Sequence, residues 1–231
     1  MSNPEAIEIW HGNIIAEDAH FQAYWLILDL IEQTHAAKIA NELLRKRYVE
    51  VRGRLRIILA EILNEQPNKI NIEKTGYGKP YLVDHPELVF NLSHSAGVLV
   101  IAVGYNCQLG VDIENCKPRA NLFALVDKCF SDEESIYWNK LPEVQKTPGF
   151  YHFWTRKEAF VKATGRGIAL GLSNCVIDPE NQTAFLSVPA DYGPASKWHV
   201  RDLVLAQGVC SALVADKALM NIRVFDLDSS I

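Results

Sequence analysis

Residues 109–114, Leu-Gly-Val-Asp-Ile-Glu, alternate apolar and acidic side chains, a pattern typical of a short strand with one buried face. Residues i and i+2 of a strand point to the same side. Asp112 and Glu114 are therefore expected to project together, while Val111 and Ile113 point into the core. Neighbouring carboxylates repel each other unless a cation lies between them, and Mg²⁺ prefers such oxygen ligands. A solvated acidic strand end fits the same pattern, and residues 110–114 alone favour that simpler interpretation.

A helix is expected from about residue 150 to 164, ending at Gly165. Residues three or four apart share a helix face, which places Trp154, Glu158 and Lys162 along one line. Glu158 can then serve as a metal ligand and Lys162 as a phosphate clamp. The alternative is a surface pair between these two side chains, worth about 0.3–0.5 kcal/mol.

Residues 90–95, Phe-Asn-Leu-Ser-His-Ser, are predicted to end a strand and enter a turn over 93–97. His94 lies between Ser93 and Ser95, so this turn can offer side-chain and backbone donors to an anion. A turn with a structural histidine fits equally well on these residues alone.

The rest of the chain alternates between strand and helix patterns. Edge strands are predicted around 7–10 and 24–28, a long helix over 34–63, and helical structure over 119–146. Further strands are predicted at 89–92, 98–105, 175–177, 184–188, 198–205, 210–215 and 222–225, the last five in a second sheet. Because a long helix followed by strands occurs twice, we expect an α+β fold of two related halves, residues 1–109 and 110–231.

Composition limits the class of protein. The 231 residues are 48% hydrophobic and carry a net charge of −5, which favours a packed globular protein over a nucleic-acid binder. The N-terminus lacks the pattern of a signal peptide, and no apolar run approaches the ~18 residues of a membrane span. Five scattered cysteines without a Cys-x-x-Cys predict reduced thiols in a cytoplasmic protein.

One region of this acidic protein carries an excess of basic residues. The polar side of the helix predicted over 34–63 is strongly basic, with Lys38, Arg45, Lys46, Arg47, Arg52, Arg54 and Arg56. A multiply anionic ligand would find a docking surface there.

The motifs occur in a specific order: Gly78-Lys79-Pro80, then residues 90–95, then 110–114, then 154–165. This combination resembles the 4′-phosphopantetheinyl transferase superfamily, and its Sfp-type members in length and motif style, over about residues 40–170. The resemblance implies two α/β halves with pseudo-twofold symmetry and an active site between them. It also implies transfer of 4′-phosphopantetheine from coenzyme A to a serine of an apo acyl, peptidyl or polyketide carrier protein, releasing 3′,5′-ADP.

The resemblance further implies roles for particular residues. Asp112, Glu114 and Glu158 would hold Mg²⁺, with Mn²⁺ as a substitute, and Asp112, Glu158 and Lys162 would be the catalytic residues. Coenzyme A would be contacted by Arg52, Lys79, Ser93, His94, Lys157 and Lys162. Among these, Lys157 and Lys162 would stabilise the departing 3′,5′-ADP, and the others would bind the nucleotide, chiefly its 3′-phosphate. Arg45, Lys46 and Arg47 lie nearby without an individual assignment.

Three functions are compatible with these patterns. The first is the transferase, acting as a monomer without nucleic acid or membrane. The second is a binding protein of the same fold that holds coenzyme A or a carrier without catalysis. The third is another Mg²⁺-dependent phosphate enzyme, which the absence of a Gly-x-x-x-x-Gly-Lys-Ser/Thr motif disfavours. Glu158 is a candidate base in the first, directly or through a water molecule.

Overall fold

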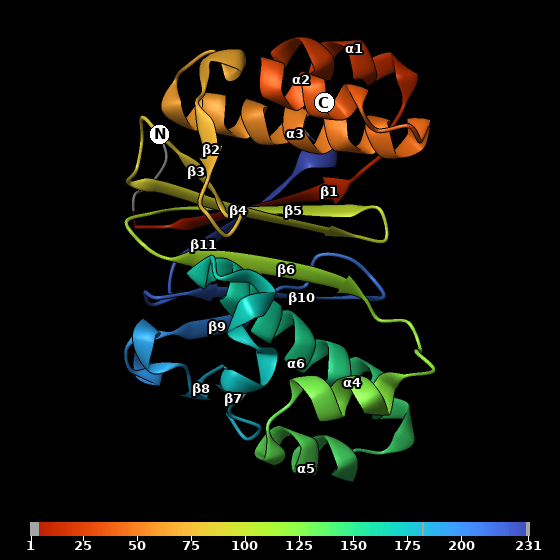
Figure 1. Ribbon diagram of the computed structural model, residues 1–231, viewed down its shortest axis with the longest axis vertical. Helices are drawn as coiled ribbons and strands as arrows, with labels where there is room; N and C mark the ends of the chain where they lie inside the picture. The colour runs from red at the N-terminus through yellow and green to blue at the C-terminus, as the bar shows by residue number, and fades with distance from the viewer. Residues whose placement is uncertain (1–4, 182, 230–231) are drawn as a thin grey trace.

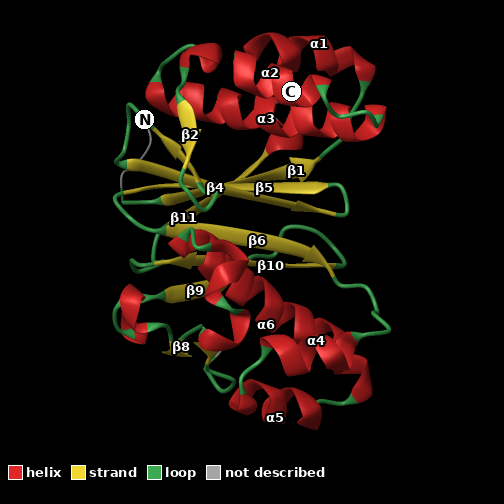
Figure 2. Ribbon diagram, viewed as in Figure 1, coloured by secondary structure: helices red, strands yellow, loops and turns green. Residues whose placement is uncertain are grey.

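The computed structural model describes residues 5–181 and 183–229 and has four layers, helices on the outside and two sheets between them (Figure 1). The first sheet has the order β11-β1-β5-β4, and the second has the order β6-β10-β9. Figure 2 shows the helices from the N-terminal part covering the first sheet and the later helices covering the second.

The elements of the first two layers come from both ends of the chain. The helices are α1 (Asp18–Ile27), α2 (Leu30–Ala37) and α3 (Glu42–Leu63), and the strands are β1 (Ile7–Asn13), β4 (Leu88–Ser95), β5 (Val98–Tyr105) and β11 (Ile222–Asp226). A separate hairpin consists of β2 (Ile72–Lys74) and β3 (Pro80–Leu82), with the one-turn helix η1 (Pro67–Lys69) before it.

The second pair of layers contains the strands β6 (Leu109–Asn115), β9 (His199–Asp202) and β10 (Val209–Ala215) and the helices α4 (Leu122–Cys129), α5 (Asp132–Lys140) and α6 (Glu143–Thr164). A further two-stranded sheet joins β7 (Val176–Ile177) to β8 (Phe185–Ser187). Short 3₁₀ turns complete this part: η2 (Gly167–Leu170), η3 (Leu172–Asn174), η4 (Ala190–Tyr192) and η5 (Ala195–Lys197). The turn η6 (Leu227–Ser229) follows β11 and packs against β1 in the first pair of layers.

Strand alternation sends side chains into three apolar clusters. On β6, Val111 and Ile113 enter the cluster between the two sheets, together with Ile9 of β1. Leu99 and Ile101 of β5 face the other way and pack under α3. The remaining cluster lies between the second sheet and α6. Asp112 and Glu114 occupy the positions of β6 that alternate with its core residues, as the sequence predicts.

Several predicted elements need correction. Residues 24–27 lie in helix α1, not in a strand, because Tyr24 and Leu28 are buried at helical spacing while Leu26 between them is 63% exposed. The helix predicted over 34–63 is two helices, α2 and α3, and Asn41 caps the second. Residues 119–146 form α4, α5 and the start of α6, with Ser131 capping α5.

Two further corrections concern strands. Ser93, His94 and Ser95 lie within β4, because the turn that joins β4 to β5 is confined to Ala96 and Gly97. Strand β11 belongs to the first sheet, where it pairs in parallel with β1. Strands β7 and β8 form a sheet of their own, so of the five strands predicted for the second sheet only β9 and β10 lie in it. The division at residue 109 and the pseudo-twofold relation stay predictions, and the return of β11 shows that the C-terminal segment contributes to both sheets.

The prediction of reduced thiols is wrong for one pair. Cys116 and Cys210 form a disulfide. The antiparallel register of β6 and β10 brings these cysteines together although 94 positions separate them in the sequence. Cys107, Cys129 and Cys175 are free thiols. Within the described ranges, no helix is long and apolar enough to cross a membrane.

Candidate active site

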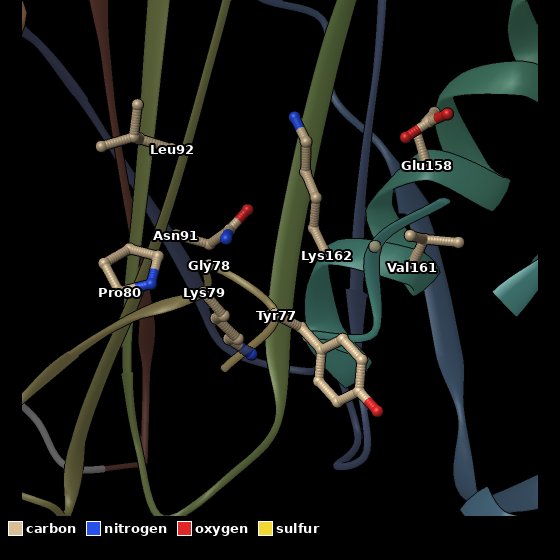
Figure 3. Close-up of a pocket in the computed structure, with 11 residues that line it drawn as sticks. Tyr77, Gly78, Lys79, Pro80, Asn91, Leu92, Glu158, Val161 and Lys162 are labelled. Carbon is tan, nitrogen blue, oxygen red and sulfur yellow. The ribbon is translucent and has the colours of Figure 1, made fainter. Parts of the chain in front are cut away.

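A cavity of about 320 Å³ opens between the hairpin β2–β3 with β4 on one side and α6 on the other (Figure 3). Its lining brings together three predicted site residues, Lys79, Glu158 and Lys162. The remaining lining residues are Tyr77, Gly78, Pro80, Asn91, Leu92, Val161, Gly165 and Gly167.

Gly110 explains how α6 reaches this place. A Cβ atom at Gly110 would lie 2.0 Å from the carbonyl oxygen of Ala159 and 2.4 Å from the amide nitrogen of Ala163. Only a residue without a side chain allows this close approach of helix and strand backbones. As a result, Glu158 and Lys162 of α6 lie beside the acidic face of β6.

Asp112 is the most buried carboxylate of the site, with 4% of the residue exposed. Its Oδ1 accepts hydrogen bonds from Ser93 Oγ at 2.9 Å and from Lys162 Nζ at 2.7 Å. Its Oδ2 is buried without a hydrogen-bond partner. Burial raises the pKa of Asp112, although Lys162 and Ser93 act against that rise. A buried acceptor without a donor is an unusual feature that a bound cation would satisfy.

The other two carboxylates are also destabilised as anions. Burial and the charge of Asp112 raise the pKa of Glu114, whose Oε2 accepts a bond from Ser95 Oγ at 3.3 Å. Burial and the charges of Asp112 and Glu114 raise the pKa of Glu158 to about 7, against the effect of Lys162. Three carboxylates whose pKa values are raised by burial, two of them also by neighbouring carboxylate charge, form a donor set suited to a cation.

Polar side chains of β4 bridge the edges of the two sheets. Asn91 Oδ1 accepts a hydrogen bond from the amide of Val111 at 2.9 Å, and Ser95 Oγ accepts one from the amide of Asn115 at 3.2 Å. Ser93 lies between them and receives a bond from Lys162 Nζ at 2.8 Å. In this structure Ser93 therefore orients Asp112 and Lys162, and its contact with a nucleotide stays a prediction.

His94 points to the opposite side of β4 from Ser93 and remains solvent-accessible. Partial desolvation and the positive charges of Lys162 and Arg47 lower its pKa. Arg47 of α3 is exposed, and its charge contributes to the lowered pKa of His94. The sequence identified Arg47 only as one member of a basic group, and the tertiary structure singles it out.

Lys79 holds the hairpin against the second pair of layers. Its Nζ donates to the carbonyl oxygens of Leu109 at 3.2 Å and Ala163 at 2.5 Å. Burial lowers the pKa of Lys79 to about 8. The side chain lines the cavity, and its predicted contact with coenzyme A stays a prediction.

Two of the residues predicted to contact coenzyme A are paired with carboxylates inside the protein, and their contact with coenzyme A stays a prediction. Arg52 binds Glu32 of α2 through Nε and Nη2, each 2.5 Å from Oε1. Lys157 is fully buried, lies 2.6 Å from Glu134 Oε2 and donates to the carbonyl oxygens of Leu172 and Cys175. Neither residue lines the cavity. A cation that is removed from water needs a carboxylate and further acceptors, and both side chains have found them inside the protein.

No three histidine, cysteine or carboxylate side chains within residues 5–181 and 183–229 lie close enough together to hold a metal ion as they stand. The carboxylates of Asp112, Glu114 and Glu158 are near enough to shift one another's pKa values. A metal would require these side chains to converge further.

Sequence comparisons identify the family. A family model for the 4′-phosphopantetheinyl transferase superfamily matches residues 108–214. The 4′-phosphopantetheinyl transferase HetI of Nostoc sp. is 31% identical over 215 residues, which cover 91% of this chain and 87% of HetI. The chain belongs to the 4′-phosphopantetheinyl transferase superfamily. The superfamily resemblance predicted from the motif order is thereby confirmed.

Shorter matches agree with this superfamily. The 4′-phosphopantetheinyl transferase psf-1 of Bacillus pumilus is 38% identical over 120 residues, covering 52% of this chain and 50% of psf-1. Sfp of Bacillus subtilis is 32% identical over 120 residues, covering 52% of each chain. Enzymes of this superfamily modify carrier proteins with phosphopantetheine from coenzyme A, which is the activity that the motifs predict.

Proposed function

We propose that this chain is a Mg²⁺-dependent transferase that binds coenzyme A in the cavity between the hairpin β2–β3 and α6 and modifies a serine of apo carrier proteins. The observation that carries the proposal is the contact of Lys162 with the buried Asp112 at the edge of this cavity. This contact brings Lys162 of α6, a cation that can bind phosphate, next to Asp112 of β6, a carboxylate that can bind a metal.

The donor set fits Mg²⁺, and Mn²⁺ as a substitute. Asp112, Glu114 and Glu158 supply carboxylate oxygens, the ligands that hard cations prefer. The partnerless Oδ2 of Asp112 is an acceptor available for such an ion. When bound, Mg²⁺ would neutralise charge on the pyrophosphate of coenzyme A as the reaction proceeds.

The protein's own cations suit the remaining negative charge. Lys162 has a long side chain, 28% exposed, whose Nζ can move from Asp112 to a phosphate oxygen. His94 and Arg47 lie on the side of β4 and α3 where a second anionic group can bind. We assign the pyrophosphate to Lys162 and the 3′-phosphate to His94 with Arg47 and Lys79.

The reaction exchanges one phosphorus–oxygen bond for another. The serine oxygen of the carrier bonds to the phosphorus that bears pantetheine, and the bond from that phosphorus to the bridging pyrophosphate oxygen breaks, releasing 3′,5′-ADP. The serine proton must leave during attack. Glu158 is the candidate acceptor, directly or through a water molecule, because its carboxylate lines the cavity close to Asp112 and Lys162.

One experiment tests this proposal directly. The protein is incubated with coenzyme A, Mg²⁺ and each of several apo acyl, peptidyl and polyketide carriers, and the carriers are weighed by mass spectrometry. We expect a gain of one phosphopantetheine that EDTA abolishes and Mn²⁺ restores. Coenzyme A binding in calorimetry without any mass gain would instead support a binding protein.

A monomeric, cytoplasmic enzyme stays a prediction. Size-exclusion chromatography with light scattering measures the first property, and fractionation of the source cells measures the second. A dimer in which the partner covers the cavity would contradict the proposed site.

A further inference from the structure

The loop of the hairpin β2–β3 forms one wall of the proposed coenzyme A cavity through Tyr77, Gly78 and Lys79. The hairpin is a separate two-stranded sheet rather than part of either main sheet. Gly78 has a left-handed φ of 87°, and a Cβ at Gly76 or Gly78 would meet no atom within 4 Å. The loop backbone is therefore uncovered at these positions, and its placement depends on side-chain contacts.

Tyr77 provides one such contact. Its hydroxyl accepts a hydrogen bond from Arg166 Nη1 at 2.7 Å, and the guanidinium lies 5.2 Å from the centre of the Tyr77 ring. Arg166 follows Gly165, the residue that ends α6 in a left-handed conformation. Figure 3 shows the Tyr77 ring beside this end of α6, away from Glu158.

Arg166 is itself held in place by the layer beyond α6. Its Nε donates to the hydroxyl of Tyr192 at 3.0 Å, and its Nη2 lies 3.6 Å from Asp191. A guanidinium donates in a fixed planar fork, so the bond to Tyr192 sets the direction of the one to Tyr77. The three side chains form a chain of contacts, Tyr77–Arg166–Tyr192, that joins the hairpin to the second half of the protein.

This chain of contacts separates two cavities. Tyr77 lines the proposed coenzyme A cavity and also a neighbouring cavity of about 280 Å³, whose wall includes Arg166, Asn174 and Tyr192. Lys79 attaches the same loop at its other end through the carbonyl oxygens of Leu109 and Ala163. Without the Arg166 contact, the loop would keep the Lys79 attachment and lose the one at its tip.

We infer that Arg166 is a positioning residue that fixes the tip of the hairpin as a preformed wall of the coenzyme A cavity, and so sets affinity for coenzyme A rather than the rate of transfer. The inference rests on the proposed function for the identity of the ligand. Its physical basis is that a wall ordered in advance spares the ligand the entropy cost of ordering it. The carboxylates lie on β6 and α6, so loosening the hairpin leaves them in place.

The test compares Arg166→Gln and Tyr77→Phe with Tyr81→Phe. Tyr81 is on the same hairpin, and its hydroxyl donates to Glu73 on the partner strand at 2.9 Å, so its bond stays within the hairpin. Tyr81→Phe therefore makes the same chemical change as Tyr77→Phe without cutting the connection to Arg166. The side chain of Arg166 is 43% exposed, which makes Arg166→Gln compatible with folding.

Three quantities are measured on each variant: hydrogen exchange of residues 72–82 in the free protein, coenzyme A binding by calorimetry, and kcat and KM with an apo carrier. Loss of a partly exposed charge-assisted hydrogen bond predicts a KM for coenzyme A about tenfold higher in Arg166→Gln and about threefold higher in Tyr77→Phe. Both should exchange faster over residues 72–82 and keep kcat. Tyr81→Phe should keep the wild-type KM.

Two results would overturn the inference. One is unchanged exchange in Arg166→Gln, which would mean that the contact does not hold the hairpin. The other is faster exchange with an unchanged KM, which would separate the hairpin from ligand affinity. Exchange is measured without ligand, so a wild-type protein that neither binds coenzyme A nor modifies a carrier would refute the proposed function separately.

Discussion

Helices α3 and α6 are each 22 residues long, and each covers the outer face of a sheet (Figure 2), yet they use their charged residues differently. On α3, Arg54 pairs with Glu50 at 2.9 Å, and Arg56 is fully buried against Glu32 and Asp29. On α6, Glu158 and Lys162 line the cavity.

The contrast comes from what each helix packs against. Gly53 of α3 accommodates Tyr24 of α1, since a Cβ there would lie 2.4 Å from the ring. Gly110 of β6 accommodates α6 itself. The tightest contact of α3 therefore faces another helix, whereas that of α6 faces the strand that carries Asp112. The number of basic residues on a helix does not show where a ligand binds, because buried cations require carboxylates of their own.

The largest effect is expected where α6 meets the cavity. Glu158→Gln removes a charge at nearly constant size and should lower transfer to an apo carrier by roughly 10²- to 10³-fold. The unfolding midpoint should stay equal or rise, because repulsion with Asp112 is relieved. Mass spectrometry of the carrier and thermal unfolding measure the two effects. Glu143→Gln, the same change in the exposed first turn of α6, is the control, and equal activity of both variants would refute the site.

The next effect tests the buried cation of α6. Lys157→Met leaves Glu134 buried without its cation and should lower the free energy of unfolding by about 3–5 kcal/mol. Adding Glu134→Gln removes the isolated charge and should restore much of that loss. Urea unfolding measures both variants. A Lys157→Met protein of normal stability with a raised KM for coenzyme A would support the predicted contact of Lys157 with coenzyme A.

The third effect separates two arginines of α3. Arg52→Ala should lower stability by about 1–2 kcal/mol, because Glu32 loses one partner and keeps Arg56, while the KM for coenzyme A stays unchanged. Arg47→Ala should raise that KM by about tenfold without a loss of stability. Steady-state kinetics give the KM for coenzyme A of each variant, and urea unfolding gives its stability. The reverse pattern would show that the basic face of α3 binds the nucleotide as the sequence predicts.

The smallest effect concerns the contact of α6 with β9. Burial raises the pKa of Asp202, but hydrogen bonds from His152 and Arg156 outweigh it and lower the value to about 2. A carboxylate with a lowered pKa adds stability above its unfolded pKa of about 4, and the gain is lost as pH falls toward 2. Screening by solvent limits this contribution to the free energy of unfolding to about 1 kcal/mol. Asp202→Asn should thus be less stable than wild type at pH 6, and the difference in the free energy of unfolding should be clearly smaller at pH 2.5, measured by urea unfolding. An equal difference at both pH values would contradict this.

Local patterns predicted the parts of the site that lie on single elements. The two-residue alternation of 110–114 placed Asp112 and Glu114 on one face, and the helix with Glu158 and Lys162 ends at Gly165 as expected. The region around Tyr24 was predicted wrongly, because Tyr24 and Leu28 are four positions apart and share a helix face, while Leu26 between them is exposed.

Contacts between distant segments were beyond local patterns. Arg47 and Arg52 are both basic residues of α3, yet five positions correspond to about 140° around a helix, so they face different neighbours. Arg52 pairs with Glu32 of α2, a contact that the local pattern of α3 does not contain. Strand β11 likewise joined β1, a partner more than two hundred residues earlier in the chain.

The sequence by itself determined the family, the carboxylates of β6 and the helix that faces them, because side-chain spacing and motif order are properties of neighbouring residues. Only the tertiary structure decided which cations remain available to a ligand, since a buried charge takes whichever carboxylate the packing brings to it. Lys157 pairs with Glu134 and Arg52 pairs with Glu32, whereas Lys162 lies beside Asp112 at the cavity.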